Sequence, residues 1–523
     1  MIIDLNEMCK HTEFISDLCI IGSGAAGLAL VSELLDTRLN IIVLESGGYE
    51  CETKTQQLYD VEISGLPLPG ATEGRFRVFG GSTTQWGGQA LPLMPIDFEK
   101  RAWIPYSGWP MTYHELSPYY TRACQFLLVD HMNFDTDLFA YLKTKPPTFN
   151  ASYILYHFSK WSPTPNVREN YVAKIKTSKH CTLLLHANAT RITLNENHHD
   201  VQQIEARSLE GQSVIVKAKY FVICAGGIES ARLLLANHHQ NPNGLGNDHG
   251  CVGRYFQDHP SAAIGWIKTK HPKKIQQWFN VFHKRGLKYS VRTTAHPKWQ
   301  DEKQTLNMSS GITFVDDNIT LDHLKNIYRD FRKRNINRHM IKMALQVMMH
   351  PHDILSPAFH YAFYGRSYAK GAKLRVGLTS EQEPNSESRI TLSHRQDALG
   401  MPLANVCWKL TELTRYSMQQ FALNLRHQFE SQGLGTIEFE PWLFDQEDKM
   451  EYITDQLHHI GSTRMHDSPR YGVVDKHCRV HDIHNLFIGS SSVFPTGGHS
   501  NPTLTIIALC IRLADHLKQV CQR

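Results

Sequence analysis

The chain has 523 residues and a formal net charge of +5; 41% of its residues are hydrophobic and 20% are charged. This composition is typical of a soluble globular protein, and the length indicates two domains rather than one core. The small net charge argues against nucleic acid as a partner, because proteins that bind nucleic acid concentrate a much stronger basic field.

The sequence also argues against a secreted, disulfide-bonded or metal-binding protein. Its first residues include Asp4 and Glu7 and lack the basic and apolar segments of a secretory signal. No apolar run reaches the roughly 20 residues that span a bilayer. The 11 cysteines are scattered without a CxxC pair, and neither HExxH nor a paired Cys/His spacing occurs. We expect a cytoplasmic protein with reduced thiols and no metal, at most peripheral to a membrane.

A nucleotide-binding unit is predicted at the start of the chain. An apolar strand over residues 17–21 meets the sequence GSGAAG, a helical stretch follows, and a second strand ends at Glu45. This order of strand, tight turn, helix and strand is the opening βαβ unit of a doubly wound sheet. In such a unit Gly22 allows the turn, Gly24 lets a pyrophosphate approach the backbone, and Gly27 allows close packing of helix on strand.

The polar groups of this unit predict a bound dinucleotide. Ala25 begins the predicted helix, whose positive N-terminal end attracts a diphosphate. Glu45 lies where a carboxylate accepts hydrogen bonds from the adenosine ribose. The unit by itself fits NAD or FAD. NAD as the direct oxidant is disfavoured, because NGLGNDHG at 243–250 has the wrong glycine spacing and the sequence offers no second nucleotide-binding unit.

Three later segments accompany this unit. Residues 75–88 form a glycine-rich loop, residues 217–235 read as a strand broken by a glycine pair and followed by a helix, and residues 485–517 read as a strand, a loop and a closing helix. Between residues 266 and 449 strand-like tracts alternate with polar turns and helical stretches. This change predicts a separate, largely antiparallel domain that covers the cofactor and shapes the substrate pocket.

Together these segments resemble the glucose-methanol-choline (GMC) oxidoreductase family, flavoenzymes that oxidise alcohols and sugars. FGGST at 79–83 resembles the family's loop beside the flavin, and CAGGIESARLLL resembles its second signature. VGRYFQDHP at 252–260 and EQEPNSESRITLS at 381–393 resemble segments common in bacterial members, while HHIGSTRM and GGHSNPTLT resemble the catalytic C-terminal region. The resemblance is closest to the bacterial choline dehydrogenase-like branch.

The resemblance implies an α/β fold with two domains. A doubly wound, Rossmann-like FAD-binding domain carries an α+β substrate domain built on an antiparallel sheet. The FAD-binding domain is predicted at residues 14–109, 165–265 and 450–523. The substrate domain is predicted at residues 110–164 and 266–449.

The resemblance also implies the residues that hold FAD. Some relatives bind flavin covalently through a histidine after the GGST sequence; Gln85 stands at that position, which predicts non-covalent FAD. Many members have an aspartate where this chain has Ser490, whose hydroxyl can still donate to a phosphate or ribityl oxygen. The implied cofactor contacts are Gly22, Gly24, Ala25, Ala26, Gly27, Glu45, Gly80, Gly81, Ser82, Thr83, Ala189, Ala225, Gly226, Gly489, Ser490, Asn501 and Thr503.

A catalytic pair follows from the same resemblance. Alcohol oxidation needs a base for the hydroxyl proton, and histidine suits this role because its pKa of about 6.5 lies near working pH. The family places its base three residues before the glycine of an H-x-x-G-T/S motif, which assigns His458, and a hydrogen-bonding partner before the last helix, which assigns Asn501. His459 is the main alternative, because a shift of one residue would promote it. His499 is a further one.

Asn501 and Pro502 also carry a structural prediction. Asparagine is a good N-cap and proline is favoured at the first helical position, so a buried helix is predicted to begin at Pro502. Its positive end would face the active site and stabilise reduced flavin. Asp258 and His259 are interpreted as packing and hydrogen-bonding residues. In the glycine-rich loop at 75–88, Arg75 and Arg77 are interpreted as solvated or as neutralising a phosphate.

The predicted function is that of an FAD-dependent dehydrogenase or oxidase, which transfers hydride from the CH–OH group of an alcohol, polyol or sugar to flavin N5. The alternatives are an FAD-containing lyase of the hydroxynitrile lyase type and a flavoprotein without catalysis. The electron acceptor stays open among oxygen, a quinone and a redox protein. The basic segment 326–342 is interpreted as a solvated helix face, with a partner- or membrane-docking surface as the alternative.

Overall fold

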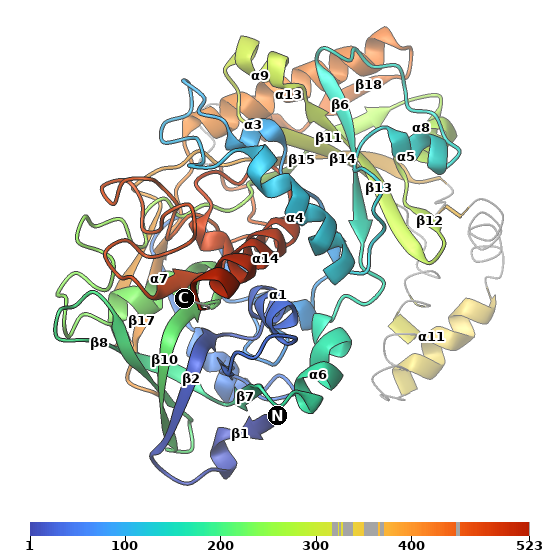
Figure 1. The fold of residues 1–523 in the computed structure, drawn as a ribbon. Helices are drawn as coiled ribbons and strands as arrows, with labels where there is room; N and C mark the ends of the chain where they lie inside the picture. The colour runs from blue at the N-terminus through green and yellow to red at the C-terminus, as the bar shows by residue number, and fades with distance from the viewer. Residues whose placement is uncertain are drawn as a thin grey trace.

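Two large sheets, each with its own hydrophobic core, build the molecule (Figure 1). Both chain termini lie with the first sheet, in the lower half of the view, and the second sheet occupies the upper half. The structure is a computed structural model, which describes residues 1–315, 323, 326, 327, 338–349, 365, 366, 371–445 and 450–521.

The first sheet contains eight strands in the order β1-β7-β3-β2-β10-β9-β8, with β19 beside β10. Neighbours from β1 to β10 and the pair β10–β19 are parallel, whereas β9 and β8 pair antiparallel. The last four residues of β2 and all of β3 are buried, as expected for parallel strands covered on both faces. The bounds are β1 (Ile2–Asp4), β2 (Thr12–Ile21), β3 (Ile41–Leu44), β7 (Cys181–Leu185), β8 (Asn188–Leu194), β9 (Val201–Arg207), β10 (Ser213–Ile223) and β19 (Leu486–Ile488).

A layer of helices packs beside this sheet. Helix α14 (Thr503–Val520) contacts both α1 (Ala25–Leu34) and α4 (Tyr113–Phe126), and all three contribute to the first core. Between α4 and α14, the Tyr120 hydroxyl lies 3.0 Å from Thr505 Oγ1. Helix α1 begins just after the carboxyl end of β2, and α14 begins after the segment that follows β19. The N-termini of both helices therefore point toward one region of the molecule, the crevice where parallel sheets bind ligands.

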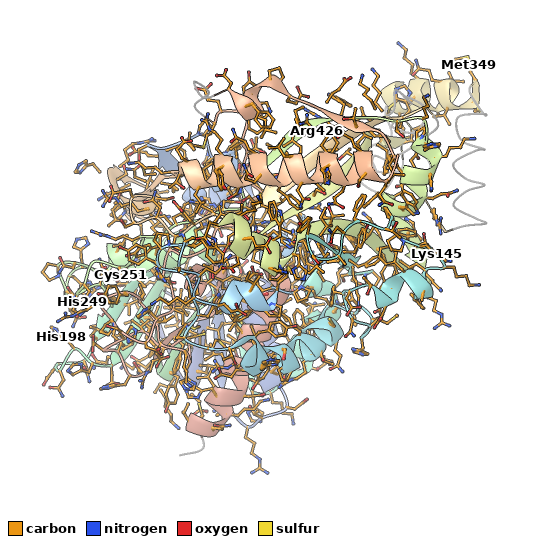
Figure 2. The ribbon with its side chains drawn as sticks, turned by 90° about the horizontal axis from the view of Figure 1, so that it is seen from above. Lys145, His198, His249, Cys251, Met349 and Arg426 are labelled. Carbon is orange, nitrogen blue, oxygen red and sulfur yellow. The ribbon has the colours of Figure 1, made fainter. Side chains whose placement is uncertain are left out.

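The second sheet is antiparallel, in the order β18-β11-β15-β14-β13-β6-β5, with β12 beside β13. Helix α13 (Glu412–Ser431) lies across it, with Arg426 labelled on that helix in Figure 2, and supplies Phe421 and Leu425 to the second core. The bounds are β5 (Gln89–Ala90), β6 (Ile154–Trp161), β11 (Ser261–Lys268), β12 (Phe282–Lys284), β13 (Leu287–Ala295), β14 (Met308–Val315), β15 (Lys373–Ser380) and β18 (Thr436–Phe439).

A three-stranded sheet, β16-β17-β4, completes the strands of the described residues. Its strands are β4 (Val61–Ile63), β16 (Arg389–Gln396) and β17 (Pro402–Cys407), and α7 (Gly226–Ala236) packs against β16 and β17. The other α-helices are α2 (Thr53–Gln56), α3 (Pro95–Phe98), α5 (Asp137–Tyr141), α6 (Val167–Thr177), α8 (Pro272–Phe279), α9 (Pro297–Lys303) and α11 (Arg338–Met349). Short 3₁₀ helices span Leu5–Glu7, Gln57–Tyr59, Pro69–Ala71, Gly81–Thr84, Pro441–Phe444 and Ser491–Val493.

The predicted fold class is confirmed, and several elements lie wholly or partly outside the domain predicted for them. Helix α4 was predicted within the substrate segment 110–164, but its apolar face is buried against α14 in the first core. Strands β16 and β17 were predicted within 266–449, but they pair with β4. Strand β5 and the first residues of β11 were predicted within the FAD-binding domain, but both strands belong to the second sheet. Each difference arises from pairing between distant segments, which local patterns do not encode.

The periphery of the molecule carries helix α11 and two exposed histidines. Among the residues that the structure describes, no helix has the length and apolar character needed to cross a bilayer. Most of the basic segment 326–342 lies outside the described residues; α11 begins at Arg338 and ends at Met349, at the periphery of the view in Figure 2. His198 and His249 are exposed at the opposite edge, as expected for solvated loops.

Candidate active site

A cavity of about 590 Å³ lies where the predicted cofactor segments meet. The Gly-rich turn after β2, the loop at 81–89, the start of α7 and the start of α14 all line it. The predicted residues on its wall are His458, His459, Gly22, Gly24, Ala25, Ala26, Glu45, Gly81, Ser82, Thr83, Ala189, Ala225, Gly226, Gly489, Ser490, Asn501 and Thr503. Three predicted residues are not part of the wall, namely Gly27, Gly80 and His499.

Glycines hold the two loops of the nucleotide end close together. Gly22 has φ of +103°, and a Cβ there would clash with the carbonyl of Cys224. Gly80 also has a positive φ, of +100°, and its N–H donates to the Ser23 carbonyl at 3.2 Å. A Cβ on Gly81 would stand 2.9 Å from the Gly24 Cα. These contacts bring the GGST loop against the first turn of α1.

Gly27 serves packing alone, because a Cβ at this position would overlap the carbonyl of Gly22. Gly27→Ala should therefore lower the melting temperature of the FAD-free protein by several degrees, since overpacking costs about 1–3 kcal/mol. Gly24→Ala is the matched control, because its Cβ would meet only Gly81 Cα at 3.9 Å. Differential scanning fluorimetry decides the point; equal melting temperatures for the two variants would contradict this packing role.

The polar groups of the cavity fit a dinucleotide. Helices α1 and α14 both begin at its wall without a side-chain cap, so the N–H groups of two helix N-termini lack an intrahelical or side-chain acceptor. Glu45 accepts from Ser23 N and Gly47 N at 3.0 and 2.9 Å, and burial raises its pKa. The hydroxyls of Ser23 and Ser46 also donate to this carboxylate, at 2.5 and 3.3 Å, so a ribose hydroxyl would replace one of these two donors. FAD therefore fits these residues, with its diphosphate at α1.

Arg75 and Arg77 are neither solvated nor free. Both line the cavity, both lie over the Tyr59 ring, and they bind the two carboxylate oxygens of Glu229 at 3.1 and 2.9 Å. Arg232 is a third partner of Glu229, at 3.0 Å. Burial opposes ionisation of Glu229, yet the three guanidinium groups lower its pKa to about 2. The cluster fixes the start of α7 to the loop at 75–77.

His458 sits between two side chains at the other end of the cavity. Its Nε2 lies 3.1 Å from Asn501 Nδ2, and its Nδ1 lies 2.8 Å from His259 Nδ1. The structure thus brings together the two residues predicted as the catalytic pair, although they lie 43 positions apart in the chain. His259, which was interpreted as a packing residue, is the third member of the group.

Backbone pairing explains this meeting. Gln257 and Ile460 exchange backbone hydrogen bonds of 2.9 Å in both directions, and this antiparallel bridge places His259 opposite His458. Asp258 fixes the same loop, because its carboxylate accepts from the backbone N–H groups of His259, Gln456 and His458 at 2.6, 2.9 and 2.9 Å. Burial, and then the charge of Asp455, raise the pKa of Asp258 to about 7.

The hydrogen bonds determine where the imidazole protons lie. His259 Nε2 is 3.3 Å from the Gly497 carbonyl, which can only accept, so His259 carries its proton on Nε2. His259 Nδ1 is then an acceptor, and His458 must donate its Nδ1 proton to it. The remaining nitrogen of neutral His458, Nε2, is unprotonated and accepts from the Asn501 amide. A proton acceptor therefore stands at the cavity wall.

Electrostatics keep these rings neutral. Burial, followed by the charges of His259, His459 and Arg292, holds the pKa of His458 well below its usual value of 6.5. Burial also lowers the pKa of His259 to about 4. A neutral imidazole is the form that accepts a proton.

The two alternative histidines are placed differently. His459 lines the cavity, but its Nε2 is buried without a partner in the described part of the chain, and its ring packs at 5.9 Å from Phe256. His499 Nε2 lies 3.0 Å from Thr294 Oγ1, and its ring packs 4.8 Å from that of His157. Neither ring is hydrogen-bonded to Asn501.

The start of α14 differs from its prediction. The helix begins at Thr503, with Pro502 as the N-cap residue, and no side chain caps it. The Asn501 amide bonds His458 and does not cap the helix. Asn501 donates its N–H₂ to the buried imidazole, and its Oδ1 accepts no N–H of the first turn, so the helix N-terminus stays open to the cavity.

Comparison with known proteins relates this chain to a family. Two models described as GMC oxidoreductase match the chain, one over residues 166–261, which include His259, and one over residues 384–510, which include His458 and Asn501. These matches support the GMC oxidoreductase family for this chain. The chain has the FAD-binding fold of this family, and both family models that it matches describe an oxidoreductase. The predicted family is thereby supported at the level of the GMC oxidoreductases.

Several known proteins are similar to this chain over almost their whole length. The fructose dehydrogenase large subunit of Gluconobacter japonicus is 23% identical, with 96% of this chain and 97% of that protein covered. The 2-methyl-1,2-propanediol dehydrogenase of Mycolicibacterium austroafricanum is 24% identical, with 96% and 95% covered. The crystal structure of formate oxidase shares the fold, with a TM-score of 0.58, 16% identity, and 98% and 99% covered.

The site can be compared with the sequence predictions on metal binding and on residues 258 and 259. Within the described ranges no group of three or more His, Cys, Asp or Glu side chains could hold a metal ion. Asp258 and His259 were interpreted only as packing and hydrogen-bonding residues, whereas the structure places His259 against the predicted catalytic pair. The only signal for them was their position in VGRYFQDHP, one of the segments that resemble the family.

Proposed function

We propose that this chain oxidises the CH–OH group of a small alcohol, polyol or sugar, with His458 Nε2 as the general base and Asn501 as the donor to the substrate oxygen. One observation carries the proposal: an unprotonated imidazole nitrogen, with an amide donor 3.1 Å away, stands at the wall of the cavity that fits FAD. Bound FAD supplies the hydride acceptor for the carbinol carbon.

The protein's own residues handle the proton. A substrate hydroxyl that enters between His458 and Asn501 donates to Nε2 and accepts from the Asn501 amide, in place of their present mutual bond. His458 takes the hydroxyl proton as the carbon is oxidised. His259 accepts from His458 Nδ1–H throughout, which holds the ring orientation and stabilises the charge that the ring gains. Asp258 keeps the loop in place through three backbone N–H groups.

The names of the relatives support a CH–OH substrate, since one is a fructose dehydrogenase and the other a diol dehydrogenase. The test is anaerobic addition of alcohols, polyols and sugars to the purified FAD-loaded protein. We expect the visible flavin absorbance to bleach with at least one of them, and oxygen, a quinone or a redox protein to restore it. Product formation without bleaching would favour the lyase. No turnover in the whole panel would leave a flavoprotein without catalysis.

We further propose membership of the bacterial choline dehydrogenase-like branch, a cytoplasmic location and non-covalent FAD. Gln85 lines the cavity, and its amide cannot form the histidyl–flavin bond. Acid precipitation should therefore release all the flavin into the supernatant. Flavin absorbance that stays with the washed pellet would contradict this prediction.

The lowered pKa of His458 predicts an unusual pH profile. A base with a pKa of 6.5 would lose half its activity at that pH, whereas His458 stays neutral to lower pH because burial disfavours its cation. We expect the kcat/KM for anaerobic flavin reduction to be flat from about pH 8 to about pH 6 and to fall only below that range. A midpoint at or above pH 6.5 would contradict this prediction.

A further inference from the structure

One charged side chain near the catalytic loop has no role in the proposed mechanism. Arg292 lies at the centre of β13, directly opposite His157 of β6, and two residues before Thr294, so all three side chains share one face of the second sheet. Thr294 bonds His499 and the His157 ring packs on that of His499. The face that carries Arg292 therefore covers the loop at 496–501, which ends in Asn501.

Arg292 differs from Arg101 and Arg232, two other arginines of the interior, because no carboxylate of the described residues pairs with it. Arg101 pairs with Glu381 at 2.5 Å, and Arg232 pairs with Asp397 at 2.7 Å. Arg292, which is half-buried, makes no ion pair and donates no hydrogen bond to any described residue. Burial lowers its pKa, and no carboxylate acts in the opposite direction. A guanidinium group in such a place is costly unless an anion joins it.

Space for such an anion lies beside the guanidinium group. Arg292 extends over Gly311 of β14, where an added Cβ would stand 3.6 Å from Arg292 Nε. Gly311 pairs with Gly377 of β15, which pairs with Ala263 of β11. This row of three small residues carries nothing larger than a methyl group, and each is partly exposed. An added Cβ on Gly377 would meet only the Ala262 carbonyl, at 3.6 Å.

His157 is the second observation that points to a ligand. Its side chain is only 8% exposed, and neither ring nitrogen has a partner within the described ranges. One ring nitrogen of a neutral histidine carries a proton, so a donor is available next to Arg292. Burial, with His499 and Arg292, keeps the pKa of His157 well below 6.5, so the local charge is that of one guanidinium group. One negative charge balances it.

We propose that Arg292, with His157 beside it, binds a carboxylate of the substrate, so that the substrate class is hydroxy acids rather than neutral alcohols. This inference rests on the proposed function and names its substrate class. The planar guanidinium fork matches a carboxylate in a bidentate pair. With the carboxylate at Arg292, the CH–OH group would extend toward the loop at 496–501, which His499 joins to the face that carries Arg292.

The test compares D-galactonate with galactitol, which share a carbon skeleton and differ in the carboxylate. In anaerobic flavin reduction by the FAD-loaded protein, we expect a higher kcat/KM for galactonate, and we expect Arg292→Leu to lower the ratio of the two values about 10- to 100-fold. Arg292→Lys keeps the charge without the fork and should lower the ratio less. Arg375→Leu, on the exposed end of β15, is the matched control and should leave the ratio unchanged. A ratio insensitive to Arg292→Leu would overturn the proposal.

A second measurement does not depend on turnover. Malonate has no CH–OH group, so its affinity for the FAD-loaded protein, measured by calorimetry, reports the anion site alone. We expect binding that weakens about 10- to 100-fold in Arg292→Leu and stays unchanged in Arg375→Leu. Equal binding to wild type and Arg292→Leu would overturn the proposal. Malonate binding that depends on Arg292, together with no flavin reduction by any alcohol, would support the anion site and refute the proposed function.

Discussion

His458→Ala should slow anaerobic flavin reduction by a CH–OH substrate about 10²- to 10⁴-fold, the usual contribution of a general base. The variant should keep its FAD, because the nucleotide end of the cavity is built by other segments, among them the turn at Gly22 and the start of α1. Stopped-flow absorbance gives the rate, and the flavin-to-protein ratio gives the occupancy.

The neighbouring histidine is the control for this prediction. His459 is buried and lines the same cavity, but it makes no hydrogen bond to Asn501. We expect His459→Ala to reduce the rate far less than His458→Ala. The reverse order would move the base by one position and would contradict the assignment.

The second large effect is expected at His259, which acts on the reaction through His458. His259→Leu removes the acceptor of His458 Nδ1–H, so the tautomer that carries its proton on Nε2 becomes competitive and blocks the base. We expect kcat to fall about 10- to 100-fold, as for other orienting partners of functional histidines, with little change in KM or FAD content. Steady-state and stopped-flow kinetics measure both parameters.

A conservative variant separates orientation from packing. His259→Gln offers an amide oxygen that can accept from His458 Nδ1–H, and it should recover part of the activity that His259→Leu loses. If His259→Gln and His259→Leu reduce kcat equally, or if both variants lose FAD, then His259 stabilises the fold and does not select the tautomer of His458.

Sequence patterns predicted those parts of the fold that depend on residues within one short segment. The turn at Gly22, the helix that begins at Ala25 and the strand that precedes Glu45 follow from glycine conformations and apolar runs within one short segment. Helix α4 was assigned to the wrong domain because its partner, α14, lies near the other end of the chain. Likewise, the pairing of β17 with β4 depends on contacts that no local period encodes.

The same distinction applies to the site. The family motifs pointed to His458 and Asn501, and the structure brings the two together at 3.1 Å. The role of His259 depends on a backbone bridge between Gln257 and Ile460, some 200 residues apart, and is invisible without coordinates. Arg292 carried no motif at all; it differs from an ordinary strand arginine because it has no ion pair among the described residues and lies beside the row of small residues.

A crystal structure of the FAD-loaded protein with an unreactive alcohol analogue tests the central claim most directly. The account predicts the hydroxyl oxygen within about 2.6–3.2 Å of both His458 Nε2 and Asn501 Nδ2, with His458 Nδ1 still bonded to His259. A hydroxyl bound away from this pair, or a His458 ring that faces the cavity through Nδ1, would contradict it.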